Sequence, residues 1–330
     1  MKVKKIIKQL LIKMGIMHSN VRRIPFSQTV YVPRWRLKNY YAVHEFGEEH
    51  RRWFIEQRYT YELKQFPDLD NPKLFNEKIH WLNLYYKNPL ITRCCDKLEL
   101  KNYVAEKVGE QYTVPNIAVY NRASEIEFDK LPSKFVIKVN WGDGKEFLEI
   151  VKDKAAVDTH MIKAKMNNAM RPWNNLYYSH FFWGYKNVKP KIYVEEFLES
   201  YKEDLNDYKV HCFNGNAKFV LVCEERSTKK EMNKTFLDTD WNVLPFGRKD
   251  GKINTSVLKP ENFSKMLMIA ECLAKPFPFV RVDFYSVKNE LYVGEMTFHP
   301  GCGWESFYPE KWNRIIGDML ILPKEKILEE

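Results

Sequence analysis

The chain has 330 residues, 45% of them apolar, and 53 lysine and arginine residues against 43 acidic ones give a formal net charge of +10. This composition excludes a disordered chain and is sufficient for two or three packed lobes. The positive charge favours an anionic partner such as nucleotide phosphates, an acidic glycan, nucleic acid or a membrane surface. The six cysteines show no CxxC pair and no zinc-like spacing with the eight histidines, which favours a reduced, cytoplasmic location.

Residues 1–70 predict a basic N-terminal extension. Within residues 2–17, apolar side chains from Ile6 to Met14 share one helical stripe surrounded by lysines. This pattern is typical of a helix that lies peripherally on the anionic inner face of the plasma membrane, and equally of a helix docked on the protein itself. Both interpretations stay open.

Residues 71–190 predict helices followed by a first α+β subdomain. The segment LFNEKIHWLNLYY repeats apolar residues at helical spacing and ends before Pro89, and one further helix is expected from about Leu90 to Val108. Strands are expected at residues 116–120, 134–139 and 146–151. The last two flank Asn140-Trp141-Gly142-Asp143-Gly144-Lys145, which has the form of a flap whose backbone N–H groups cradle phosphates.

Residues 191–330 predict a second α+β subdomain with antiparallel sheets. Strands are expected at residues 191–197, 208–213 and 217–223, followed by a polar loop at 224–234 and a helix at 260–275. The triplet Asp238-Thr239-Asp240 resembles the DxD of nucleotide-sugar glycosyltransferases, although the residues after it also fit a plain turn.

The stretch from Phe279 to Gly303 predicts a β-hairpin, because two alternating runs flank a polar turn at Lys288-Asn289-Glu290. Pairing centred on Asn289 places Asp283 opposite Glu295 and Arg281 opposite Thr297. Like charges directly opposed on one sheet face are destabilising, and a cation between them removes that cost. Mg²⁺ suits this position, since it takes one or two carboxylates together with phosphate oxygens. The alternative is a solvated strand face on which Arg281 neutralises one acid.

These features together resemble the ATP-grasp superfamily, and within it the TupA-like branch, which is named for teichuronopeptide synthesis. The resemblance covers about residues 70–320 and rests on six segments in the same order: LFNEKIHWLNLY, CDKLELKNYVAEKVG, FVIKVNWGDG, DYKVHCFNG, PFVRVDFY and GEMTFHPGCGWE. It implies an α+β ATP-grasp fold in which two subdomains clasp ATP. It also implies an ATP-dependent carboxylate–amine ligase of capsule or O-antigen polysaccharide synthesis, with ATP and Mg²⁺ as cofactors.

The resemblance further implies roles for individual residues. Lys97 and Lys138 would meet the nucleotide phosphates beneath the flap glycines Gly142 and Gly144. The residues implied for the adenine and the ribose are Glu195, Glu196, Phe197, Leu198 and Asp207. Asp283 and Glu295 would hold Mg²⁺, and the residues implied for the transfer reaction are Arg281, Lys209 and Arg226.

The sequence departs from the branch at three positions. Trp141 and Asp143 stand in the flap where the branch shows His and Ser, and Thr297 replaces a common asparagine. An aspartate close to a triphosphate is repulsive unless a cation offsets it, which puts Asp143 in doubt as a phosphate contact. Thr297 is a poor Mg²⁺ ligand, so a second metal ion would have to be held differently.

The expected partners are an amino acid or other amine and a carboxylate on an acidic glycan or a glutamyl chain, and no nucleic acid. Lys209, Arg226 and the basic residues 229–234 would hold the acidic glycan. Two other classes stay open. One is a glycosyltransferase that uses Asp238 and Asp240 with Mn²⁺, and the other is a non-catalytic nucleic-acid or membrane binder.

Overall fold

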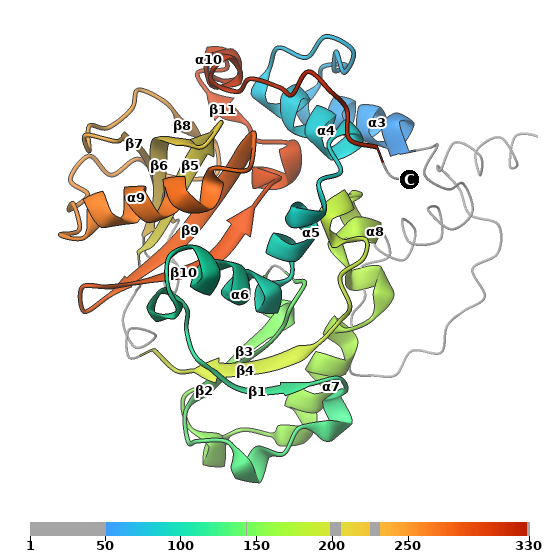
Figure 1. Ribbon diagram of the computed structural model, residues 1–330, viewed down its shortest axis with the longest axis vertical. Coiled ribbons are helices and arrows are strands. Elements are labelled where there is room, and N and C mark those ends of the chain that lie inside the picture. The colour runs from blue at the N-terminus through green and yellow to red at the C-terminus, as the bar shows by residue number, and fades with distance from the viewer. Residues whose placement is uncertain (1–50, 143, 199–205, 225–231, 329–330) are drawn as a thin grey trace, which may run out of the picture.

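A computed structural model describes residues 51–142, 144–198, 206–224 and 232–328 (Figure 1). The amphipathic stretch at residues 2–17 lies outside the described residues. The helices are α3 (Arg51–Leu63), α4 (Phe75–Tyr85), α5 (Pro89–Cys95), α6 (Lys97–Lys107), α7 (Thr159–Ala169), α8 (Leu176–His180), α9 (Phe263–Ala274) and α10 (Lys311–Met319). Within the described ranges no helix has the length and apolar character needed to cross a membrane.

The strands form two larger sheets in which every neighbouring pair is antiparallel. The first sheet has the order β1-β4-β2-β3 and consists of β1 (Asn116–Tyr120), β2 (Phe135–Val139), β3 (Leu148–Val151) and β4 (Ile192–Glu196). The second has the order β10-β9-β5-β6-β7 and consists of β5 (Asp207–Phe213), β6 (Asn216–Glu224), β7 (Asn233–Asp238), β9 (Phe279–Val287) and β10 (Glu290–Thr297). A short pair joins β8 (Gly247–Arg248) to β11 (Phe307–Tyr308). This arrangement confirms the predicted α+β class with antiparallel sheets.

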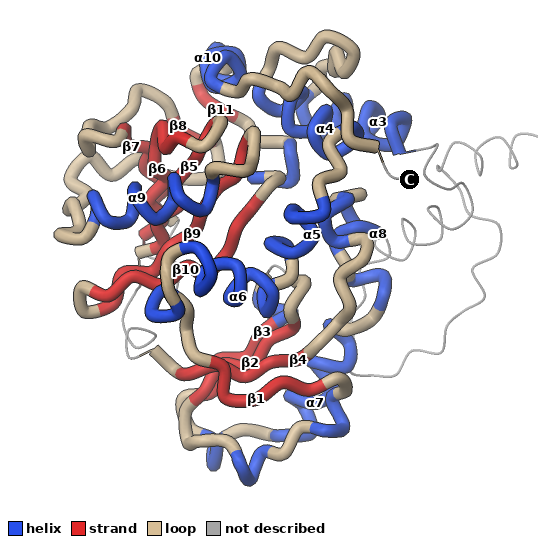
Figure 2. The backbone as a smooth tube through the Cα atoms, in the orientation of Figure 1, coloured by secondary structure: helices blue, strands red, loops and turns tan. Residues whose placement is uncertain are grey.

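The two sheets lie one above the other, and α6 lies between them (Figures 1 and 2). The predicted division of the chain at residue 190 stays a prediction, but β4 pairs with β1 and β2 in the first sheet. The change from one sheet to the other therefore falls between Glu196 and Asp207.

The single helix expected over residues 90–108 is wrong, because the chain breaks at Asp96 into α5 and α6. The Asp96 side chain accepts hydrogen bonds from the backbone N–H groups of Leu98 and Glu99 and so caps α6. Both α5 and α6 contact β10, and the break places Lys97 in the first turn of α6.

Two apolar clusters hold these layers together. The larger one joins the first sheet, α6 and the α9-covered face of the second sheet, with the Val280 and Val282 side chains at its centre. The smaller one packs α4 and α10 onto the opposite face of the second sheet, through Phe75, Phe213 and Phe279. Both faces of the second sheet are therefore covered along part of its length, which fixes β9 and β10 in place.

Candidate active site

The β9–β10 hairpin has the predicted pairing at its chemically important end. Asp283 pairs with Glu295, and Arg281 pairs with Thr297. The other face of the hairpin is buried, as expected from its alternation, with Val282 and Met296 fully inside the apolar cluster. Because side chains alternate across a strand, Asp283 and Glu295 project from the opposite face.

The predicted three-residue turn is wrong. Lys288 and Asn289 alone make the turn, both with positive φ, as a tight two-residue hairpin requires, and Glu290 already pairs with Val287. A bulge at Gly294 then shifts the register by one residue and so restores the predicted pairing of the acids. A side chain at Gly294 would lie 2.6 Å from the Tyr285 ring, so any residue other than glycine would require this ring to move.

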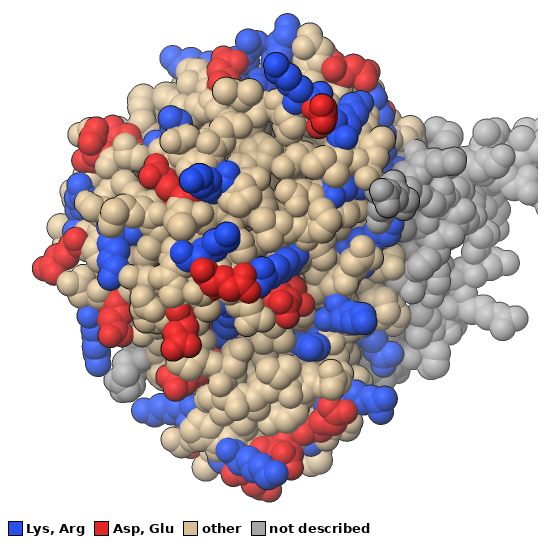
Figure 3. Space-filling model, in the orientation of Figure 1, with Lys and Arg blue, Asp and Glu red and all other residues tan. Residues whose placement is uncertain are grey.

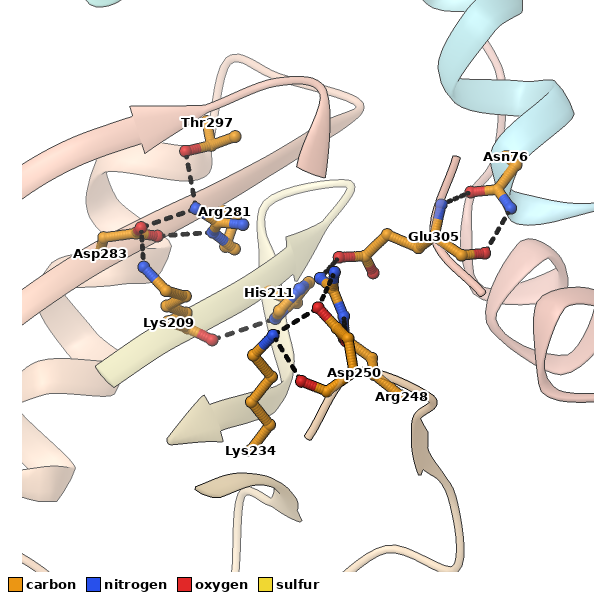
Figure 4. Close-up of polar contacts among 10 residues, drawn as sticks. All are labelled: Asn76, Lys209, His211, Lys234, Arg248, Asp250, Arg281, Asp283, Thr297 and Glu305. Carbon is orange, nitrogen blue, oxygen red and sulfur yellow. Dashed lines mark hydrogen bonds and ion pairs between the residues drawn. The ribbon is translucent and has the colours of Figure 1, made fainter. Parts of the chain in front are cut away.

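Asp283 is 3% exposed and lies in a compact network of charges (Figure 4). Its carboxylate accepts two hydrogen bonds of 2.7 Å from Arg281 and one of 2.6 Å from Lys209. The Lys209 ammonium also lies 2.6 Å from Asp207. Burial by itself would raise the pKa of Asp283, but the charges of Arg281 and Lys209 outweigh it and lower this pKa to about 2. The carboxylate is therefore ionised throughout the physiological range.

Glu295 faces the same side and has its own lysine. Lys97 donates from its ammonium to Glu295 at 3.2 Å and to the backbone carbonyl of Gly142 at 2.9 Å. The contact joins the start of α6 to the predicted flap and to β10. Each acid of the hairpin is thus neutralised by a protein cation, which agrees in part with the alternative of a structural ion pair.

The donor set also fits a divalent cation. Asp283 and Glu295 supply oxygen ligands from neighbouring strands, and the Thr297 hydroxyl, which accepts a 3.1 Å hydrogen bond from Arg281, lies beside them. The described residues contain no group of three or more His, Cys, Asp or Glu side chains placed to hold a metal. A Mg²⁺ ion here would therefore complete its coordination with phosphate oxygens and water, as this ion usually does.

Lys138 on β2 belongs to a second charge network. Glu195 on β4 forms ion pairs with both Lys138 and Lys101, the latter at 2.9 Å. Burial alone would raise the pKa of Glu195, but the two lysines lower it. The pairing fixes the Lys138 side chain between β2 and β4, close to where the predicted flap begins.

A cleft of about 620 Å³ runs between the two sheets. Nine of the residues implied by the resemblance line it: Lys97, Lys138, Gly142, Gly144, Asp207, Lys209, Arg281, Asp283 and Glu295. These residues come from both sheets, from α6 and from the segment after β2. A volume of this size is within the usual range for small-molecule and cofactor sites.

Other predicted residues are placed differently. Glu195, Glu196, Phe197 and Leu198 do not line this cleft, and Leu198 packs instead against Val114 and Val287. Arg226 lies outside the described residues. Asp238 forms a turn in which its carboxylate accepts hydrogen bonds from the backbone N–H groups of Asp240 and Asn242. Neither Asp238 nor Asp240 lines the cleft.

The structure also brings in residues that the sequence did not single out. Arg248 on β8 lines the cleft together with His180, Phe182 and His299, whose rings form a stack. Lys234, by contrast, is one of the basic residues 229–234 that the sequence did single out; it lines the cleft too, but it lies on β7 and not in the expected polar loop. In the sequence, only the segment GEMTFHPGCGWE pointed to this part of the cleft, because it carries the family resemblance and contains His299.

A comparison with protein families matches the TupA-like ATP-grasp family over residues 77–321, well over half of the chain. The chain belongs to the TupA-like ATP-grasp family. No curated protein matches the chain.

Solved structures of ATP-grasp ligases are similar in part. A D-alanine–D-alanine ligase from Bacillus anthracis is 16% identical with a TM-score of 0.40, over 62% of this chain and 57% of its own. The enzyme of the same name from Helicobacter pylori is 14% identical with a TM-score of 0.38, over 70% and 59%. The ATP-grasp ligase PsnB, solved with a minimal precursor, Mg and ADP, is 9% identical with a TM-score of 0.37, over 71% and 60%. The match therefore spans about three fifths of the length of these proteins.

Proposed function

We propose that this protein is an ATP-dependent carboxylate–amine ligase that forms an amide bond through an acyl phosphate and releases ADP and phosphate. Its proposed role is to attach an amino acid or amine to an acidic cell-surface glycan, such as one containing a uronic acid, or to extend a glutamyl chain. We also propose that the protein acts in the cytoplasm.

The observation that carries the proposal is the convergence of charged groups on one cleft. Lys138 comes from the first sheet and Lys97 from the start of α6, while Arg281, Asp283 and Glu295 come from the hairpin of the second sheet. Phosphoryl transfer depends mainly on positioning and on neutralising charge, so such a set of residues is sufficient without a protein nucleophile.

Each group has a defined part in this scheme. In this proposal the lysines bind phosphate oxygens, and Arg281 stabilises negative charge on the transferred phosphoryl group or on the acyl oxygen. Mg²⁺, when bound by Asp283 and Glu295, neutralises further phosphate charge. The segment after β2, with Gly142 and Gly144 in the cleft wall, would exclude water from the acyl phosphate.

The glycosyltransferase alternative has little support. Asp238 uses its carboxylate to build the turn after β7, and it accepts a further hydrogen bond of 3.0 Å from the Asn242 side chain. Both acids of the triplet stand away from the cleft lining. A nucleotide sugar held by Asp238 would need this turn to open.

The distribution of charge gives no support to a nucleic-acid surface on the described face and leaves the basic N-terminal extension as the feature on which a binder would rest. Residues 1–50 contain ten basic and three acidic side chains, so seven of the ten excess positive charges lie there. On the face drawn in Figure 3, basic and acidic side chains are interspersed over the described part of the chain. A nucleic-acid surface would require a patch of one sign.

The test is product formation by the full-length protein. With MgATP and a panel of uronates and amino acids, the proposal expects release of ADP and phosphate that depends on both an acid and an amine. Thermal shifts with ATP, ADP and nucleotide sugars, each with and without Mg²⁺, discriminate between the classes. Stabilisation by nucleotide sugars and not by ATP would favour the glycosyltransferase and overturn the ligase.

A further inference from the structure

The residues that lead from β2 into the cleft are held from several sides. Residues 140–142, here called the flap arm, form the first part of the segment that we assign to the nucleotide phosphates. Gly142 lines the cleft, whereas Trp141 beside it is 4% exposed and lies in the larger apolar cluster. The flap arm therefore has a cleft side and a core side, and its contacts on the core side decide how freely it moves.

Asn140 joins the flap arm to α6 and to the chain before β4. It is fully buried, its backbone N–H donates to the carbonyl of Lys191 at 3.0 Å, and its carbonyl accepts from the N–H of Lys97 at 3.0 Å. Its side chain donates to the carbonyl of Lys189 at 3.0 Å and accepts from the N–H of Lys191 at 2.8 Å. These four hydrogen bonds fix the start of the flap arm.

Trp141 binds the flap arm to the end of α7. Its indole Nε1 donates to the carbonyl of Ala169 at 3.1 Å, and Ala169 is the last residue of this helix. The last four carbonyls of a helix have no N–H partner inside the helix, so a donor from outside stabilises them. One hydrogen bond thus satisfies both a buried indole N–H and the end of a helix.

Gly142 is held by contacts with two other side chains. Its carbonyl accepts a 2.9 Å hydrogen bond from the Lys97 ammonium, which also donates to Glu295. A side chain at Gly142 would lie 2.0 Å from the Phe147 ring, which is 2% exposed and belongs to the larger apolar cluster. The returning segment therefore packs directly on the flap arm. An ammonium has three N–H groups, so Lys97 can keep both contacts and still donate to a phosphate oxygen.

We propose that the flap arm is already fixed before the nucleotide binds, as a wall of the cleft and not as a closing lid, and that Trp141 is a positioning residue for it. Trp141 does not line the cleft, so it acts through the position of Gly142. The sequence departs from the family at this tryptophan, and the structure gives it a role behind the flap. The inference rests on the proposed function for the identity of the ligand.

A fixed flap arm favours nucleotide binding because the protein does not have to be ordered by the ligand. Each residue that a ligand must order weakens its binding, since the lost backbone entropy opposes association. Only molecules with the flap arm in place offer Gly142 to the phosphates, so the apparent affinity falls with the fraction of molecules in which the arm is loose. Removing the bond to α7 should therefore weaken phosphate binding without touching the ligand.

Hydrogen exchange followed by mass spectrometry on the full-length protein tests this proposal, with and without MgADP. The reporters are peptides that contain Asn140 and Phe147, whose backbone N–H groups are hydrogen-bonded at 3.0 and 3.2 Å. The variant is Trp141→Phe, which keeps an aromatic ring and removes the donor to α7. Trp241→Phe is the matched control, because the Trp241 indole makes the same kind of bond, at 3.0 Å to the carbonyl of Val257, and does not line the cleft.

In the wild type and in Trp241→Phe, we expect the reporter peptides to exchange at least about a hundredfold more slowly than an unstructured chain, even without nucleotide. In Trp141→Phe they should exchange about tenfold faster than in the wild type, as the loss of one buried hydrogen bond predicts. Exchange in the wild type at the rate of an unstructured chain, which MgADP then slows, identifies a closing lid and overturns the proposal. This measurement needs no variant. Equal exchange in the two variants also overturns it.

Nucleotide binding separates a positioning role from a merely structural one. Trp141→Phe should weaken MgADP about threefold or more and leave adenosine, which has no phosphate, unchanged. A loss that is equal for both ligands, or no loss, overturns the positioning role. If the wild type neither binds MgADP nor forms ADP, the proposed function fails, whereas exchange without nucleotide still decides whether the flap arm is fixed.

Discussion

Replacing Asp283 with asparagine removes one negative charge from the centre of the cleft and keeps the shape of the side chain. The wild-type carboxylate accepts three short hydrogen bonds from Arg281 and Lys209. Arg281 is itself buried, so the variant leaves a buried guanidinium without its acidic partner. We expect the variant to be less stable and to lose Mg²⁺-dependent nucleotide binding.

The size of the effect follows from the pKa of Asp283. This pKa falls from 3.8 to about 2 on folding. A shift of about two units corresponds to roughly 2.5 kcal/mol of folding free energy, which the asparagine variant would lack at neutral pH. A lowered pKa stabilises the fold above the unfolded value of 3.8, and this contribution disappears as the pH falls toward 2. Between pH 8 and 5 the difference between wild type and variant should therefore be constant.

Urea unfolding at several pH values measures this difference. The matched control is Asp318→Asn, which breaks an exposed 2.8 Å pair with Arg314 on α10 and should cost less than about 0.5 kcal/mol. Equal stabilities of the Asp283 and Asp318 variants at pH 7, or a difference that already shrinks between pH 8 and 6, would refute the reasoning.

Three other variants probe neighbouring features. Lys209→Met leaves the buried Asp207 and Asp283 without their shared ammonium, so a loss of about 2–4 kcal/mol is expected in EDTA. Part of the lost unfolding free energy should be restored when Mg²⁺ is added, and urea unfolding measures this. If Mg²⁺ has no effect on stability, the result argues against a metal site at Asp283. Burial lowers the pKa of His299 well below 6.5, and the charges of His80, Arg51 and His180 lower it further. In the unfolded chain this imidazole binds a proton below pH 6.5, so the fold is destabilised as the pH falls below that value. His299→Phe keeps the ring stacked on Phe182 at 4.2 Å and should reduce the slope of unfolding free energy against pH by up to about 1.4 kcal/mol per unit between pH 6 and 4. An unchanged slope would contradict the attribution of this pH dependence to His299. Asp238→Ala should cost about 1 kcal/mol through its turn and leave ATP binding unaltered, whereas a loss of nucleotide-sugar binding would revive the glycosyltransferase reading.

The sequence by itself determined the features that depend on near neighbours. The alternation of residues 279–298 predicted which side of the hairpin is buried and which residues oppose each other, because a strand has a strict period of two. It missed the bulge at Gly294 and the two-residue turn, since two compensating one-residue shifts leave the apolar alternation near the acids unchanged. The break at Asp96 was also local, but the apolar periodicity continued across it and concealed the cap.

Only the tertiary structure decided which charges meet. Lys97 contacts Glu295 across 198 positions of sequence, and Lys101 contacts Glu195 across 94. Glu305 and Arg248 meet because β8 pairs with β11 beside the end of the hairpin. Periodicity records only whether a side chain faces the core, whereas the partner of a charge depends on how separate sheets and helices pack. The acids of the hairpin were therefore readable from the sequence, and the cations that surround them required the fold.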